Sequence, residues 1–200
     1  MKAYYNKDDE WMSSASLLTA LDLEEQHPKV IAAVGAGGKT STMYQLAREF
    51  AAGGKRTAIV TTTHMELPPP DMFFTQNASE AAAQLDRQGF VIAGVQINEK
   101  NFASLPTEGY RLLLDATDVL LVEADGSKRM PLKIPASHEP VIPAEAEFVI
   151  VIAGLSSLGK RIDETCHRAE LVKMMLGKEG DHSISPEDIA VLLRRGYWEP

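Results

Sequence analysis

The stretch VIAAVGAGGKTS, residues 30–41, decides the fold of this chain. Residues 30–34 are an apolar run rich in β-branched side chains, which predicts a buried strand. The glycine-dense residues 35–38 predict a turn, and Lys39-Thr40-Ser41 open a segment with helical spacing. The pattern is G-x-x-x-x-G-K-[ST] with Ala33 in the first glycine position, and it lies at a strand-to-helix transition, where its mechanism requires it.

This junction has the groups needed to hold a phosphate. Glycine takes positive φ without a Cβ clash, so successive backbone N–H groups can point at one anion, and the next helix presents its positive end to it. Lys39 would reach the outer phosphates, and Thr40 would ligate Mg²⁺. A glycine-rich turn without a ligand is the simpler interpretation, but the position between strand and helix argues against it. We expect the nucleotide-binding residues to be Gly35, Ala36, Gly37, Gly38, Lys39, Thr40 and Ser41.

Composition narrows the class of protein. The chain has 200 residues, 44% of them hydrophobic and 24% charged, which is ordinary for one globular domain. Its net charge of −8 makes nonspecific binding to nucleic acid or anionic membranes unfavourable, so we expect neither as a partner. One cysteine, Cys166, and a polar N-terminus that lacks the apolar core of a signal peptide favour a cytoplasmic location.

Apolar strand patterns alternate with helical patterns along the chain. This alternation predicts an α/β fold, a P-loop NTPase-like three-layer sandwich whose mostly parallel sheet carries helices on both faces. Besides residues 30–34, the expected strands are residues 57–62, 90–95, 118–122 and 148–153. The expected helices are residues 13–26, 42–52, 79–88, 106–116, 163–176 and 186–195, and residues 128–143 read as a long extended loop.

We expect residues 1–200 to form a single P-loop-type α/β domain. Within it, residues 1–12 are expected to be a flexible N-terminal segment, and residues 163–200 a C-terminal helical extension. An exposed apolar face on the last two helices would indicate either a homodimer or a contact with a partner protein.

A second constellation follows the strand expected at residues 118–122. A P-loop needs a carboxylate at the end of a neighbouring strand to hold Mg²⁺, and the sequence LLVEAD supplies Glu123 and Asp125. If the strand continues, residues two apart point to one face, so both carboxylates would share the metal region. We therefore expect Lys39, Glu123 and Asp125 to be catalytic and Thr40, Glu123 and Asp125 to hold the metal, although isolated acids at a strand end are more often merely solvated.

Other polar side chains are weaker candidates for contact with substrate or phosphate. The basic residues after the acids could grip an anion, or simply form a solvated loop. The strand tip TTTH could contact a hydrated Mg²⁺, and a loop histidine could act as an acid or base. These candidates are Thr63, His64, Lys128, Arg129, Lys133 and His138.

The segments VGAGGKTSTMYQLA, TTTHM, VEADGSKRMPLKIPASHEPVIP and IAGLSSLGKRIDETCHRAELV closely resemble the YqeC family, accessory proteins of selenium-dependent molybdenum hydroxylases. The resemblance runs from about Leu17 to the end of the chain. It implies a P-loop nucleotide-binding protein that helps to mature the hydroxylase cofactor, with the hydroxylase or its cofactor-assembly proteins as partners. The family's nucleotide loop corresponds to Gly35–Ser41 and its acidic motif to residues 123–126. No Asn-x-x-Asp type motif follows here, so ATP and GTP both stay open.

Three functions fit these features. The first is an NTP hydrolase that acts as a maturation factor, with hydrolysis switching nearby loops. The second is a ligase-type enzyme that resembles the Mur-type amide ligases and activates a carboxylate with ATP. The third is a carrier that holds a phosphorylated molybdopterin-type cofactor in the same cradle and hydrolyses nothing. The paired carboxylates favour a cation beside the phosphate, and so favour the first two over the third.

Overall fold

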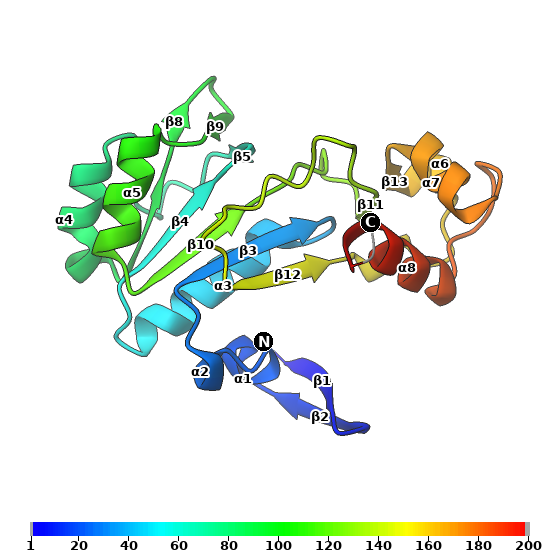
Figure 1. The fold of residues 1–200 in the computed structure, drawn as a ribbon, viewed down its shortest axis with the longest axis horizontal. Helices are drawn as coiled ribbons and strands as arrows, with labels where there is room; N and C mark the ends of the chain where they lie inside the picture. The colour runs from blue at the N-terminus through cyan, green and yellow to red at the C-terminus, as the bar shows by residue number, and fades with distance from the viewer. Residues whose placement is uncertain (1, 199–200) are drawn as a thin grey trace.

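The centre of the protein is a six-stranded sheet in which every neighbouring pair of strands is parallel (Figure 1). The computed structural model describes residues 2–198. The strand order is β12-β3-β10-β4-β7-β6. The strands are β3 (Val30–Gly35), β4 (Thr57–Thr61), β6 (Phe74–Thr75), β7 (Phe90–Ala93), β10 (Val119–Glu123) and β12 (Phe148–Ile152). Because β3 and β10 are adjacent, the glycine loop and the acidic tip meet at one edge of the sheet.

Helices cover both faces of this sheet. Helix α3 (Lys39–Ala52) packs on one face, and α4 (Ala78–Gln88) and α5 (Thr107–Ala116) pack on the other. Each face of the sheet has its own hydrophobic core, and successive side chains of β10 point into different cores. Leu121 belongs to the core on the α3 side, and Leu120 to the core on the α4/α5 side. The expected α/β three-layer sandwich of the P-loop NTPase-like type is therefore confirmed.

A small antiparallel sheet was not expected from the sequence. It consists of β5 (His64–Glu66), β9 (Asn101–Ala103) and β8 (Val95–Gln96). We expected one strand over residues 90–95, but β7 ends at Ala93 and β8 begins at Val95. Gly94 between them lies against Phe102, where a Cβ would come within 2.2 Å of the ring. Strands of two or three residues leave no measurable periodicity in a sequence, which explains the omission.

The N-terminal region is more ordered in secondary structure than we expected. Where residues 1–12 were expected to be flexible, β1 (Ala3–Lys7) and β2 (Glu10–Ser14) form an antiparallel hairpin, and residue 1 lies outside the described residues. Its two-residue turn, Asp8-Asp9, has positive φ at both positions, as a type I′ turn requires, but lacks the glycine that usually marks one.

The prediction of one continuous helix over residues 13–26 was also wrong. The structure has α1 (Leu17–Ala20) and α2 (Leu23–Gln26), separated where Asp22 adopts a left-handed conformation with φ 59°. Leu18 and Leu23 pack into the core beside α3.

The C-terminal part folds around its own apolar cluster, beyond the edge strand β12 (orange and red in Figure 1). It contains a 3₁₀ turn η1 (Leu155–Ser157), α6 (Ile162–Thr165), β13 (Cys166–His167), α7 (Ala169–Leu176), α8 (Pro186–Leu193) and a π-helical turn η2 (Arg194–Trp198). The single helix expected over residues 163–176 is thus interrupted by β13. The expected loop at 128–143 supplies β11 (Leu132–Lys133), which pairs in parallel with β13.

We call this part the C-terminal unit, residues 154–198 together with β11. Its last helix begins as the sequence indicated, because Ser185 and Asp188 form a capping box around Pro186. Within residues 2–198, the structure contains no helix with the length and apolar character needed to cross a membrane.

Candidate functional site

The glycine loop is shaped by close contacts with neighbouring chain segments. Gly35 and Gly37 have φ of +95° and +77°, and a Cβ on either would come within 2.1 Å of the Ile152 oxygen or 2.5 Å of the Pro131 oxygen. The N–H groups of Gly35 and Ala36 donate inside the protein, to Asp125 and Ile152. Gly35 and Ala36 therefore build the loop, while the expected binding residues 37–41 line a cleft.

This cleft has a volume of about 810 Å³, within the usual range for small-molecule sites. The glycine loop and Glu123 form one part of it. The small antiparallel sheet, the loop after Asp125 and the C-terminal unit supply the others. Its polar lining residues outside the glycine loop are His64, Glu66, Asn101, Glu123, Ser127, Lys128, Arg129, Glu139, His167 and Arg168.

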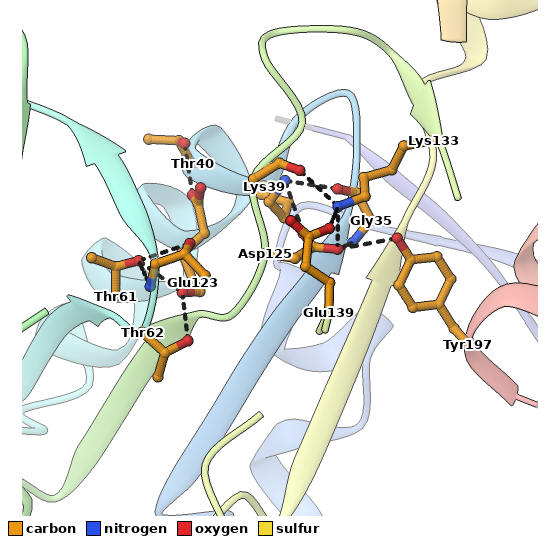
Figure 2. A network of polar contacts seen from close by, with 12 residues as sticks. Gly35, Lys39, Thr40, Thr61, Thr62, Glu123, Asp125, Lys133, Glu139 and Tyr197 are labelled. Carbon is orange, nitrogen blue, oxygen red and sulfur yellow. Dashed lines mark hydrogen bonds and ion pairs between the residues drawn. The ribbon is translucent and has the colours of Figure 1, made fainter. Parts of the chain in front are cut away.

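Glu123 is the carboxylate that reaches the start of α3 (Figure 2). The Thr40 hydroxyl donates to its Oε2 at 3.0 Å, and the Glu123 peptide oxygen accepts from the Thr61 hydroxyl at 2.9 Å. The side chain is buried, and this burial raises the pKa of Glu123, against the opposing effects of Lys39 and Thr40. A buried carboxylate whose negative charge is only partly balanced by its neighbours, and which lies beside a hydroxyl, is suited to bind a hard cation.

Asp125 has different surroundings from Glu123. It is fully buried beneath the glycine loop, where its Oδ2 accepts from the Gly35 N–H at 3.0 Å and from the Tyr197 hydroxyl at 3.1 Å. The ammonium groups of Lys39 and Lys133 lie 3.2 and 3.0 Å from its carboxylate oxygens. The strand ends at Glu123, so the two-residue spacing does not bring both carboxylates into the cleft, and Asp125 is not among its lining residues.

The buried charges continue from Asp125 into the C-terminal unit. Lys133, fully buried, also contacts Glu139 at 2.6 Å and donates to the Gly126 oxygen at 2.7 Å. Arg168 donates two hydrogen bonds to Glu139, at 2.8 and 2.9 Å. Although burial acts to raise it, the hydrogen bonds from Arg168 and Lys133 lower the pKa of Glu139 to about 2. The glycine loop is thus joined to the C-terminal unit through alternating charges.

The weaker candidates divide into two groups. His64, Lys128 and Arg129 line the cleft, and Arg129 forms an ion pair with Glu66. Lys133 belongs to the buried network, and neither the Thr63 nor the His138 side chain is part of the cleft lining. Thr63 instead donates its N–H to the Thr61 hydroxyl at 3.0 Å.

Several polar residues of the site had no signal in the sequence. Glu139 and Arg168 lie 29 positions apart, and Tyr197 lies 72 positions after Asp125, so only the fold brings each pair together. His167 was not among the residues that we expected in the site. Its ring now lines the cleft, where burial and the nearby cations Arg168, Lys133 and Lys128 lower the pKa of His167.

A metal held by protein side chains alone is not indicated. Among residues 2–198, no group of three or more histidine, cysteine, aspartate or glutamate side chains is arranged to hold an ion. Mg²⁺ in nucleotide sites needs only one or two protein oxygens, because phosphates and water complete its shell. The pair formed by the Thr40 hydroxyl and the Glu123 carboxylate fits that requirement.

The fold and the glycine loop together define a three-layer α/β protein of the P-loop NTPase-like class. The YqeC protein family model matches residues 31–170. The chain is also 36% identical over 177 residues to the uncharacterized protein YqeC of Escherichia coli strain K12, covering 85% of this chain and 69% of that relative. The chain therefore belongs to the YqeC family, as the sequence resemblance indicated. No solved structure is significantly similar to it.

Proposed function

We propose that this protein binds a nucleoside triphosphate with Mg²⁺ in the cleft and hydrolyses it. The observation that carries the proposal is the 3.0 Å contact between the Thr40 hydroxyl and Glu123 at the mouth of the glycine loop. It joins the threonine of the G-K-[ST] motif to a carboxylate on the adjacent parallel strand, as a Mg²⁺-nucleotide site requires.

The backbone N–H groups at the start of α3 and the Lys39 ammonium would bind the phosphates. The first N–H groups of a helix have no intrahelical partner and attract anions. Lys39 here donates to the Gly35 oxygen at 2.7 Å and pairs with Asp125, so a triphosphate must compete for it with the protein's own acceptors. Asp125 then acts as a positioning residue, because it holds Lys39 and the loop N–H of Gly35.

Thr40 and Glu123 would hold the Mg²⁺. A bound Mg²⁺ neutralises negative charge on the phosphates and orients them. The raised pKa of Glu123 is consistent with this role, since a cation would compensate the buried carboxylate.

We propose further that the protein serves in the cytoplasm as an accessory or maturation factor for selenium-dependent molybdenum hydroxylases. This role rests on the family resemblance, because the site chemistry supports the binding of phosphate and metal but does not point to a partner protein. Its nucleotide is ATP or GTP, and the experiment below distinguishes them.

The test is isothermal titration of the protein with nonhydrolysable ATP and GTP analogues, each with and without Mg²⁺. We expect one analogue to bind the unmodified protein in a Mg²⁺-dependent manner, and we expect Glu123→Gln to lose that dependence. Lys39→Ala should weaken binding at least about tenfold, as expected for a lost charge-assisted hydrogen bond. His138→Ala is the matched control, because this exposed histidine lies outside the cleft lining. Failure of both analogues to bind, or unchanged binding in Lys39→Ala, would contradict the proposed nucleotide site. Phosphate release from ATP or GTP that is unchanged in Lys39→Ala would contradict the proposed hydrolysis at this site.

A further inference from the structure

The C-terminal unit and the loop after Asp125 contribute a basic wall to the cleft. Lys128, His167 and Arg168 line the same cleft as the glycine loop but come from other elements. A phosphate cradle and its Mg²⁺ ligands use only residues 37–41 and Glu123. The basic wall therefore needs an explanation beyond nucleotide binding.

Local structure fixes two residues of this wall, His167 and Arg168. In the pairing of β11 with β13, Lys133 is opposite His167, so the ladder that holds Lys133 beneath Asp125 also holds His167 at the cleft. Arg168 adopts a left-handed conformation with φ 62° and is tied to Glu139 by two hydrogen bonds. These two residues are thus preorganised by the buried network.

Most cations of the cleft already have an acidic partner. Lys39 pairs with Asp125, and Arg129 pairs with Glu66. Arg168 pairs with Glu139, as described above. Lys128 differs, because it is exposed and forms no hydrogen bond or ion pair with any residue in the range 2–198.

His167, which lines the same cleft, also has unused hydrogen-bonding capacity. Its Nδ1 is buried and has no hydrogen-bond partner among the described residues. Unpartnered buried nitrogens are costly, and native structures seldom retain them without a role. An uncompensated ammonium and an imidazole that line one cleft form a suitable receptor for an oxyanion, to which the imidazole can donate once its ring turns a nitrogen toward the cleft.

We propose that Lys128 and His167 form a second anion-binding subsite, which holds the carboxylate or phosphate group of a small co-substrate in the same cleft as the nucleotide. The co-substrate half of this proposal rests on the proposed nucleotide function, whereas anion binding by Lys128 and His167 stands without it. Carboxylate and phosphate share the negatively charged oxygens that the two side chains would contact.

The experiment follows the imidazole C2 proton of His167 by NMR while succinate or inorganic phosphate is added. The chain has five histidines, so the His167→Gln spectrum assigns the resonance. The titration is carried out with the nonhydrolysable nucleotide analogue bound and again without nucleotide. We expect a saturable shift of this resonance, with affinity reduced at least about tenfold in Lys128→Ala. Lys160→Ala, an exposed lysine outside the cleft lining, is the matched control and should not change the affinity.

Two comparisons separate this proposal from the nucleotide proposal. A shift that persists in Lys39→Ala but is lost in Lys128→Ala supports the subsite even if neither nucleotide analogue binds. A shift that is lost in Lys39→Ala but persists in Lys128→Ala would mean that the anion occupies the glycine loop, and would overturn the subsite. The absence of any saturable shift with either anion would also overturn it. Preference for succinate over phosphate, or the reverse, identifies the group on the co-substrate.

Discussion

Replacing Asp125 by asparagine should destabilise the fold by about 3 kcal/mol, the lower end of the cost of breaking a buried ion pair. Asp125 is fully buried between Lys39, which is 4% exposed, and Lys133, which is fully buried. Asparagine keeps the shape but leaves both ammonium groups without their shared carboxylate. The lower end applies because Lys133 keeps Glu139 at 2.6 Å and Lys39 keeps the Gly35 oxygen at 2.7 Å.

Urea unfolding followed by circular dichroism measures this change as a difference in unfolding free energy. The matched control is Asp118→Asn, which removes an ion pair to Arg56 whose side chains are 36% and 47% exposed. That exposed pair should contribute between about 0 and 1 kcal/mol. If Asp125→Asn cost no more than Asp118→Asn, the buried network would not hold the loop as we argue.

A double variant tests the same reasoning from the other side. Lys133→Met alone removes one of the two ammonium groups that Asp125 faces, so it too should be destabilising. Combined with Asp125→Asn, it should cost less than the sum of the two single changes, because the buried ammonium that asparagine would leave without its carboxylate is then absent. Additive costs would contradict direct coupling of these two side chains.

Three further outcomes follow from the site. Gly35→Ala should prevent stable folding or lower the free energy of unfolding by more than about 3 kcal/mol, because its Cβ would meet a backbone oxygen at 2.1 Å. The control is Gly54→Ala, where φ is also positive but a Cβ would meet open space, and it should cost about 1 kcal/mol in urea unfolding. The pKa of Glu139 is depressed to about 2 from a usual 4.5, so its contribution to stability should be complete above about pH 4.5 and disappear as the pH falls toward 2. The difference in unfolding free energy between the protein and Glu139→Gln should therefore shrink across that window, and a constant difference would refute the assignment. Glu123→Gln should be at least as stable as the unmodified protein at neutral pH in the absence of ligand. Burial raises the pKa of this carboxyl, so its negative charge opposes folding. A lower urea midpoint for Glu123→Gln would contradict a destabilising charge at this position.

The buried network also suggests how the cleft and the C-terminal unit depend on each other. Tyr197, near the end of the described chain, donates to the same Asp125 oxygen that receives the Gly35 N–H. Burial raises the pKa of the Tyr197 phenol, reinforced by Asp125, so it stays protonated and remains a donor. The position of the glycine loop is therefore set from both the central sheet and the C-terminal unit.

The sequence by itself determined five of the six strands of the central sheet and half of the site, whereas the two-residue strand β6 was not expected. Long apolar runs such as β3 and β10 can be buried on both faces only in a parallel sheet, and a P-loop has a fixed order of strand, turn and helix. Lys39, Thr40 and Glu123 were identified from spacing alone, because each lies within two residues of the end of a strand or the start of a helix. Their proximity follows from the adjacency of the two strands.

Only the tertiary structure decided the other half. Asp125 lies beneath the loop instead of in the cleft because β10 ends at Glu123 and two lysines neutralise the buried carboxylate. His167 joins the cleft through a two-residue strand pair, which has no periodicity for a sequence pattern to reveal. Contacts between residues far apart in the chain depend on how the C-terminal unit packs against the sheet, and local residue spacing carries no information about that packing.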